Sequence, residues 1–275
     1  MRPIITEDQA GEFADIGQSM TKQPWYLAMG ACSDEVRMQS GIEVASVLPD
    51  CLFSLLRKVK NIPEINVMDV ELLITNREQK LVAATLEGLF HFYGSDKSTT
   101  HNYHIVYGAI LPYLGSTPRI LEIGLGTNNL NLISNMGSSG RPGASLRAFM
   151  QVVPQGCVHG ADIDATIFVE GAKVFVIDQR DLTSYEVIKS EGELVYDLII
   201  DDGMHTADTN INTLIFALGA MSPRGICVIE DISESNLPIW AIVQEILKDS
   251  PYSSIVVKSK SAYLFMCFHK GSYKF

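Results

Sequence analysis

The sequence predicts an α/β fold: a doubly wound, mostly parallel seven-stranded sheet with a C-terminal antiparallel hairpin, preceded by an N-terminal helical segment. After residue 93, short apolar runs alternate with longer amphipathic stretches, a pattern typical of strands joined by crossover helices. The last two apolar runs, Ser254–Lys258 and Ala262–His269, are separated by only three residues. That connection is too short for a crossover helix, so these two runs predict the hairpin.

Residues 1–92 lack this alternation and carry helical patterns instead. Apolar residues recur at helical spacing over Val44–Val59 and Arg77–Phe92. Pro49 is expected to open or kink the first of these helices. We expect residues 1–92 to form a helical lid or oligomerisation segment, and a surface-packed cap without a role in chemistry is an equal alternative. Residues 93–275 then form the second domain.

Five apolar runs predict the parallel strands, and each run is followed by polar or glycine residues. Ligands of open α/β sheets bind outside the carboxyl ends of the strands, so these following residues predict one shared functional edge. The strands are Arg119–Ile123, Cys157–Ala161, Lys173–Ile177, Leu198–Asp201 and Gly225–Ile229, and helices are expected over Ala144–Val153, Asp208–Met221 and Leu237–Leu247.

The first parallel strand leads into a turn that contains Gly124 and Gly126. Such glycines permit a sharp turn and a close approach of the backbone to a ligand, as nucleotide-binding loops require. A third fingerprint glycine is absent and Glu122 precedes the turn, which favours a ligand with hydroxyl or ammonium groups over a dinucleotide pyrophosphate. The long insert Asn128–Gly143 follows, and loops of that length are more often functional than idle.

Polar side chains also follow the second and third parallel strands, and a polar run precedes the first. Asp162 closes the second parallel strand, where an acid commonly accepts hydrogen bonds from ribose hydroxyls. Asp178 closes the third. The polar run Tyr93–Tyr103 contains Lys97 and could hold a charged small molecule, although helix capping explains such a run equally well.

The densest group of acids follows the last two parallel strands: Asp201 with Asp202, and Glu230 with Asp231. Four carboxylates on one edge repel each other unless something positive lies between them. A hard divalent cation such as Mg²⁺ or Ca²⁺ is the simplest candidate, because it prefers oxygen ligands. Solvated strand ends or helix caps are the alternative. Strand alternation points Asp201 away from Asp202, so Asp201 is not assigned to the metal.

The composition disfavours several functional classes. A net charge of −11 argues against a nucleic-acid partner, which requires a basic surface. No apolar run approaches the roughly 18 residues of a membrane span, and the N-terminus lacks a signal-peptide pattern. We therefore expect a soluble, cytoplasmic protein without a membrane partner. Five cysteines without C-x-x-C spacing argue against both a disulfide framework and a zinc site.

Together, these features resemble the class I S-adenosylmethionine-dependent methyltransferases, which have a Rossmann-like fold. A set of motifs over about residues 93–275 resembles, more narrowly, the metal-dependent sugar O-methyltransferases of macrolide and enediyne antibiotic biosynthesis. These motifs are Tyr93-Gly-Ser-Asp-Lys97, Pro142-Gly-Ala-Ser-Leu-Arg-Ala-Phe149, Gly160-Ala-Asp-Ile-Asp164, Asp178-Gln179, and Asp201-Asp-Gly-Met-His205 with Glu230-Asp231.

The resemblance implies S-adenosyl-L-methionine and Mg²⁺ as cofactors. It implies that Asp202, Glu230 and Asp231 bind the metal and that His205 is the general base, for which a capping or otherwise satisfied histidine is the alternative. The cofactor site would be formed by Glu122, Gly124, Gly126, Thr127, Asp162, Asp178, Gln179 and Asp201.

We therefore expect an O-methyltransferase that acts on one hydroxyl of a vicinal diol, on a sugar of a natural product or on a nucleotide sugar. Mg²⁺ lowers the pKa of a bound hydroxyl, and a neutral imidazole can accept its proton near neutral pH. The alternatives are a catechol-type O-methyltransferase and a cofactor-binding protein without turnover. The expected partners are a small-molecule glycoside or nucleotide-sugar substrate and further copies of the chain in a homo-oligomer.

Overall fold

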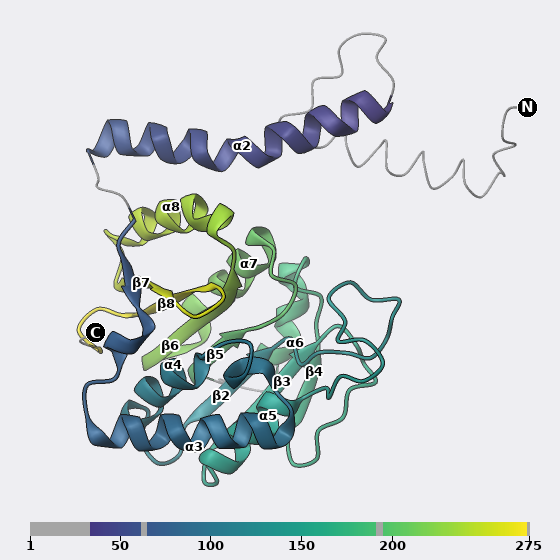
Figure 1. Cartoon of the computed structure of the whole chain (residues 1–275), viewed down its shortest axis with the longest axis vertical. Coiled ribbons are helices and arrows are strands. Elements are labelled where there is room, and N and C mark those ends of the chain that lie inside the picture. Colours follow the sequence, from purple (N-terminus) through teal and green to yellow (C-terminus); the bar gives the residue numbers. More distant parts are fainter. Residues whose placement is uncertain (1–33, 62–64, 191–194, 274–275) are drawn as a thin grey trace, which may run out of the picture. The chain divides into compact units, whose positions relative to one another are not determined.

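The computed structural model describes residues 34–61, 65–190 and 195–273, and it divides the chain into two compact units between Ile62 and Pro63. The described element of the first unit is helix α2, Asp34–Lys60 (Figure 1). Pro49 lies inside this helix rather than opening it. The unit boundary therefore precedes the one expected near residue 92, and the lid or oligomerisation role of residues 1–92 stays a prediction.

The second unit contains an eight-stranded sheet with the order β1-β7-β8-β6-β5-β2-β3-β4 (Figure 1). Strand β8 pairs antiparallel with β6 and with β7, and the other neighbouring strands are parallel. The strands are β1 (Val67–Asp69), β2 (Arg119–Ile123), β3 (Cys157–Asp162), β4 (Lys173–Val176), β5 (Tyr196–Asp201), β6 (Met221–Ile232), β7 (Tyr252–Lys258) and β8 (Tyr263–His269).

This topology confirms the predicted mostly parallel α/β sheet with a C-terminal antiparallel hairpin. The expected number of seven strands was too low by one. The additional strand, β1, is three residues long and lies in the segment for which only helices were expected. Three residues are too few to carry the alternation by which a strand is recognised in a sequence.

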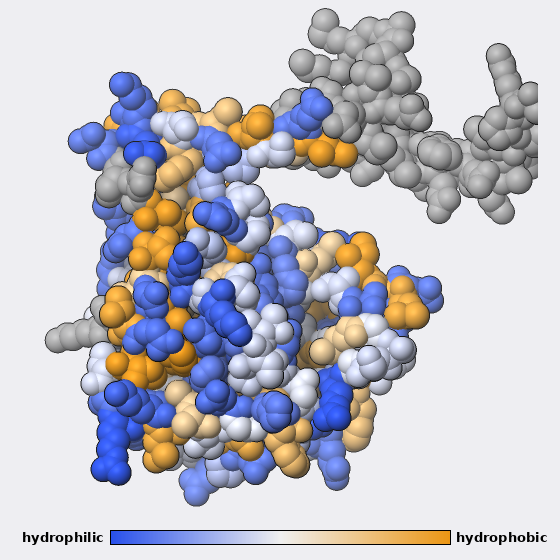
Figure 2. Space-filling model, viewed as in Figure 1, coloured by the Kyte–Doolittle hydropathy of each residue, from blue (hydrophilic) through white to orange (hydrophobic). Residues whose placement is uncertain are grey.

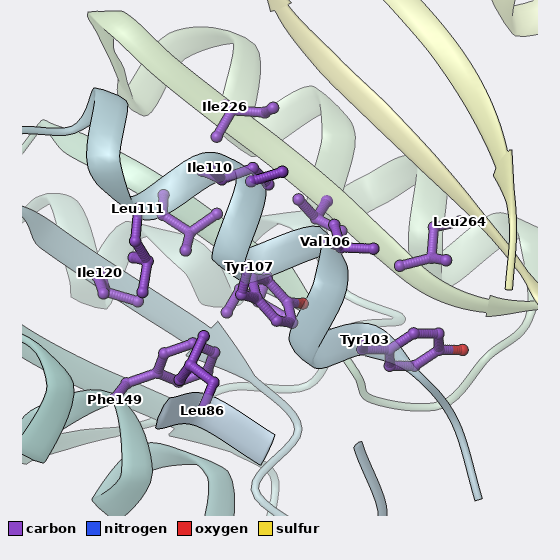
Figure 3. Close-up of a cluster of buried hydrophobic side chains, with 14 of the residues drawn as sticks. Leu86, Tyr103, Val106, Tyr107, Ile110, Leu111, Ile120, Phe149, Ile226 and Leu264 are labelled. Atoms are coloured by element: carbon purple, nitrogen blue, oxygen red, sulfur yellow. The ribbon is translucent and has the colours of Figure 1, made fainter. Parts of the chain in front are cut away.

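Helices cover both faces of the sheet, as a doubly wound fold requires (Figure 1). On one face, apolar side chains of α3, α4 and α5 pack with those of the strands, among them Leu86, Ile120 and Phe149 (Figure 3). On the other face, α6, α7 and α8 contribute to a second core that includes Leu214 and Trp240. The helices are α3 (Arg77–Tyr93), α4 (Tyr103–Ile110), α5 (Ala144–Val152), α6 (Glu186–Lys189), α7 (Ala207–Ala220) and α8 (Leu237–Leu247).

Helices α3 and α4 approach each other closely at one glycine. A Cβ atom added to Gly108 would lie 2.4 Å from the Cβ of Ala83, so only glycine fits at this position. The side chain of Gln79 in α3 also donates a hydrogen bond of 3.0 Å to the carbonyl oxygen of Ala109 in α4. These contacts fix the position of α4, and α4 carries two tyrosines that reach the candidate site.

Hydrophilic and hydrophobic residues are interspersed on the face of the molecule seen in Figure 2. Among the described residues, no helix combines the length and apolar character needed to cross a bilayer.

Candidate functional site

A cavity of about 730 Å³ lies beside the carboxyl ends of the central strands. Its walls come from the turn after β2, the ends of β3 to β6 and the insert between β2 and α5. Nine of the twelve predicted site residues line it, so the structure brings most of the predicted set together. They are Gly124, Gly126, Thr127, Asp162, Asp178, Gln179, Asp202, His205 and Asp231.

The other three predicted residues are acids behind the cavity wall. Glu122, Asp201 and Glu230 each have an exposed fraction of 0% and are not among the lining residues. A buried carboxylate must be paired or hydrogen-bonded, because burial without a partner is costly. In the structure these three acids contact protein groups.

The group that pairs with two of these acids is the ammonium of Lys97. Its Nζ lies 2.6 Å from Oδ2 of Asp202 and 3.4 Å from Oε1 of Glu122, and it forms an ion pair with Oε2 of Glu230. Only 2% of the Lys97 side chain is exposed. From the sequence, two roles were open for the polar run that contains this lysine: binding a charged small molecule and capping a helix. In the structure its side chain supplies positive charge among the crowded acids, where the sequence predicted a metal.

Burial and charge act in opposite directions on the lysine and on Glu122. Burial lowers the pKa of Lys97, but the carboxylates of Asp202, Glu230 and Glu122 together raise it well above its ordinary value. Burial raises the pKa of Glu122 to about 7, and Lys97 opposes this shift. The hydroxyl of Ser145, in the first turn of α5, donates a hydrogen bond of 2.8 Å to Oε2 of Glu122.

Two tyrosines of α4 also hold acids of this group, and Figure 3 shows their rings and hydroxyls. The hydroxyl of Tyr107 donates to Oε1 of Glu230, and that of Tyr103 donates to Oδ1 of Asp231 at 2.5 Å. Burial raises the pKa of both tyrosines, which keeps them protonated as donors. Neither contact was predicted from the sequence. The available signal was their spacing of four residues, which places two hydroxyls on one face of an apolar helix.

Three groups that could bind a metal converge at the cavity. Ligand atoms of Asp202, His205 and Asp231 all lie within 4.8 Å of one another. Nε2 of His205 is 3.8 Å from Oδ2 of Asp231, and Nδ1 of His205 is buried without a hydrogen-bond partner. Glu230 is not part of this group, and Lys97 and Tyr107 hold its two oxygens. The donor set fits a divalent cation that keeps water or substrate at its other positions.

The backbone is unusual at the same place. His205 and Asp231 have φ angles of 58° and 56°, in the left-handed region that non-glycine residues rarely adopt. Ser134, in the insert after β2, has a φ of 60° and also lines the cavity. Such strained conformations persist where the surrounding structure enforces them, and they cluster at functional sites.

The glycine turn after β2 is held by acids of β3 and the loop that follows it. Gly124 has a φ of 87°, and a Cβ there would lie 2.2 Å from the carbonyl oxygen of Asp202. Asp162 accepts a hydrogen bond of 2.8 Å from the backbone N–H of Leu125. The hydroxyl of Thr127 donates to Asp164. Asp162 and Thr127 thus support the turn as well as lining the cavity.

The two polar residues after β4 have different surroundings. Arg180 donates to both carboxylate oxygens of Asp178, which holds the pKa of that carboxyl below its usual range. The amide of Gln179 donates a hydrogen bond of 2.9 Å to Asp201 and accepts one of 2.8 Å from the N–H of Met204. Gln179 therefore joins the end of β4 to the loop after β5.

Comparisons with known proteins found one related sequence and several similar structures. No protein-family model matches the chain. Over 159 residues it is 27% identical to the 8-demethyl-8-alpha-L-rhamnosyl tetracenomycin-C 2'-O-methyltransferase of Streptomyces olivaceus. That alignment covers 56% of this chain and 39% of the relative, so the match spans well under half of the relative's length.

The MycE methyltransferase from the mycinamycin biosynthetic pathway, solved in complex with Mg and SAH, has a similar structure. The TM-score is 0.55 at 19% sequence identity, over 70% of this chain and 56% of that one. A second MycE structure, which also contains mycinamycin VI, gives the same values. The likeness confirms the Rossmann-like methyltransferase fold.

Proposed function

From its methyltransferase fold and its sequence relation to an antibiotic-pathway sugar O-methyltransferase, we propose that this protein is an S-adenosylmethionine- and Mg²⁺-dependent O-methyltransferase. It methylates one hydroxyl of a vicinal diol on a sugar, either in a glycosylated natural product or in a nucleotide sugar. One observation carries the proposal: a single cavity combines the glycine turn of β2 with the group formed by Asp202, His205 and Asp231. A methyl donor and a metal-bound acceptor must meet in such a cavity.

The cofactor would lie along the ends of β2, β3 and β4. S-adenosylmethionine supplies an electrophilic methyl group on a sulfonium centre. The turn at Gly124 and Gly126 would approach its methionine part, while Glu122 lies buried behind the cavity wall. Asp162 would accept hydrogen bonds from the ribose, and Asp178 with Gln179 would border the adenine.

The metal would lie at the ends of β5 and β6. Asp202 and Asp231 belong both to the ligand set implied by the sequence resemblance and to the group found in the structure. The third ligand is Glu230 in the first set and His205 in the second. Mg²⁺ supplies a positive charge that lowers the pKa of a coordinated hydroxyl and orients it. The oxygens Oδ1 of Asp202 and Oδ2 of Asp231 are not used by Lys97 or Tyr103.

In this proposal His205 is the general base. The imidazole lies beside Asp231 and lines the cavity. A neutral imidazole can accept a proton near neutral pH. It would take the proton of the acceptor hydroxyl as that oxygen attacks the methyl group.

The test is a transfer assay with isotope-labelled S-adenosylmethionine and a panel of glycosides, nucleotide sugars and catechols, read by mass spectrometry. We expect methylation of a sugar hydroxyl, its loss in excess chelator and its return with Mg²⁺. Asp202→Asn should abolish turnover, whereas the exposed control Asp249→Asn should leave it unchanged. Full activity in excess chelator would refute the metal dependence, and methylation of catechols alone would refute the sugar.

Cofactor binding is tested separately by calorimetry. S-adenosylhomocysteine should bind in the absence of an acceptor, with little response to NAD. Equal or tighter binding of NAD would contradict the cofactor. Binding of S-adenosylhomocysteine without transfer to any acceptor would favour a cofactor-binding protein without turnover.

A further inference from the structure

Three carboxylates converge on a single ammonium group behind the cavity wall. Nζ of Lys97 contacts Asp202 and Glu230 directly and lies 3.4 Å from Glu122. The side chains of Lys97, Glu122 and Glu230 are at most 2% exposed. Bulk water therefore cannot solvate these buried acids, which need a positive partner instead. Among the described residues, the ammonium of Lys97 is the cation that contacts them.

The ammonium contacts two acids of the ligand set that the sequence resemblance implies. Lys97 holds Oδ2 of Asp202, and together with Tyr107 it holds both oxygens of Glu230. A divalent cation bound to Asp202 would thus lie close to a fixed positive charge. Two positive charges that lie close together repel each other strongly in a buried environment, because little water screens them.

We infer that Lys97 is the resident counterion of these acids: it keeps Glu122, Asp202 and Glu230 ordered without a metal, and it weakens the binding of a divalent cation beside them. Lys97 is not among the cavity-lining residues, so it acts as a positioning residue. The inference rests on the proposed Mg²⁺ dependence. It implies that the metal binds weakly, exchanges readily and is held mainly by Asp202 and Asp231.

A purely structural lysine predicts a different result. If Lys97 only supports the positions of the acids, its removal should weaken Mg²⁺ binding or leave it unchanged. If it acts as a competing cation, its removal should strengthen Mg²⁺ binding and make folding depend on Mg²⁺. The direction of the change in affinity separates the two.

The experiment uses the full chain and titrates it with MgCl₂ by calorimetry, without substrate. Lys97→Met should bind Mg²⁺ at least about tenfold more tightly than the wild type, because the repulsion is gone. Its melting temperature should fall without Mg²⁺ and recover as Mg²⁺ is added. Lys189→Met is the matched control, since it removes an exposed lysine of α6 that pairs with Glu186. Lys97→Arg keeps the charge and should keep the wild-type affinity.

Unchanged or weaker Mg²⁺ binding by folded Lys97→Met would overturn the inference. If that variant is too unstable to titrate, Lys97→Met/Glu122→Gln at pH 8 removes one positive and one negative charge together. The competing-cation account then predicts an affinity close to that of the wild type, and binding at least tenfold weaker would overturn it. Failure of both variants to fold in saturating Mg²⁺ would also overturn it, since the metal should replace the ammonium.

These outcomes are distinct from failure of the proposed function. If the wild type binds Mg²⁺ and Lys97→Met binds it no more tightly, only the inference about Lys97 fails. If neither protein binds Mg²⁺ while both bind S-adenosylhomocysteine, the metal dependence fails as well. Binding by Lys97→Met but not by the wild type would support the inference, because the ammonium alone then excludes the metal.

Discussion

The hydroxyl of Tyr103 occupies Oδ1 of Asp231 at 2.5 Å, and Oδ2 of the same carboxylate lies 3.8 Å from Nε2 of His205. A residue of helix α4 thus sets which oxygen of an acid at the end of β6 is available to a ligand. Tyr107, one turn further along α4, holds one oxygen of Glu230, and Lys97 holds the other. The orientation of these acids at the end of β6 consequently depends on side chains of α4 as well as on the strand.

The first prediction concerns these two hydroxyls. Tyr103→Phe should lower kcat by about tenfold to a hundredfold, because Asp231 loses its fixed orientation and small misplacements at a reacting centre are costly. Its unfolding free energy should change by only about 1 kcal/mol.

Tyr107→Phe should lower the unfolding free energy, measured by urea denaturation, by about 1–3 kcal/mol, because Glu230 is fully buried and loses a partner. A larger stability loss for Tyr103→Phe than for Tyr107→Phe would contradict this ranking.

The second prediction separates two roles of His205. As general base, His205→Ala should lower the rate by about 10² to 10⁴ and leave S-adenosylhomocysteine affinity intact. Calorimetry with MgCl₂ then decides the ligand set: unchanged Mg²⁺ affinity supports a base outside the coordination sphere. An affinity reduced about tenfold or more would identify His205 as a metal ligand, and wild-type turnover would exclude both roles.

The third prediction follows from the buried carboxyl of Glu122. Burial raises its pKa from an ordinary value of 4.5 to about 7, so between these pH values the folded protein binds more protons than the unfolded chain. The unfolding free energy contributed by this group must therefore fall as pH rises from 4.5 to 7. Urea denaturation of metal-free protein over that range should show a shallower decline for Glu122→Gln than for the wild type. Identical slopes would show that Glu122 ionises normally.

The fourth prediction compares two glycines. Gly108→Ala should cost about 1–3 kcal/mol, because its Cβ would overlap Ala83 and force α3 and α4 apart. Gly88→Ala is the control, since Gly88 lies in α3 with no atom within 4 Å of an added Cβ and the change should stabilise the helix by up to about 1 kcal/mol. Thermal unfolding measures both. Equal effects of the two substitutions would show that the helices tolerate a wider separation.

The sequence predicted the central strands closely because strands buried on both faces are continuous apolar runs. The expected strand Arg119–Ile123 coincides with β2, and the expected Leu198–Asp201 lies within β5, which begins two residues earlier. The position of the site followed from topology, since parallel strands place their carboxyl ends on one edge. Strand β1 could not be found in this way, because it is too short to carry a pattern.

The side chains that contact the acids could not be predicted from the sequence for a different reason. Crowded carboxylates indicated that a positive group lies between them, and both a metal and an ammonium satisfy that condition. Lys97 is 105 residues from Asp202 and 133 from Glu230, and no periodicity connects positions so far apart. The four-residue spacing of Tyr103 and Tyr107 is a signal for two hydroxyls on one helix face, but it does not identify the acids that they contact.

Strand β1 also bears on how a shortened chain would behave. Its three residues pair with Val256, Val257 and Lys258 and so cover part of β7, which would otherwise be an open edge of seven residues. A protein trimmed to begin at Tyr93 would lose this cover, together with Leu86 and Phe90 of the core. Uncovered apolar edges recruit strands from other chains. Aggregates formed in that way would be an artefact of trimming, and they would be easily mistaken for a natural oligomer.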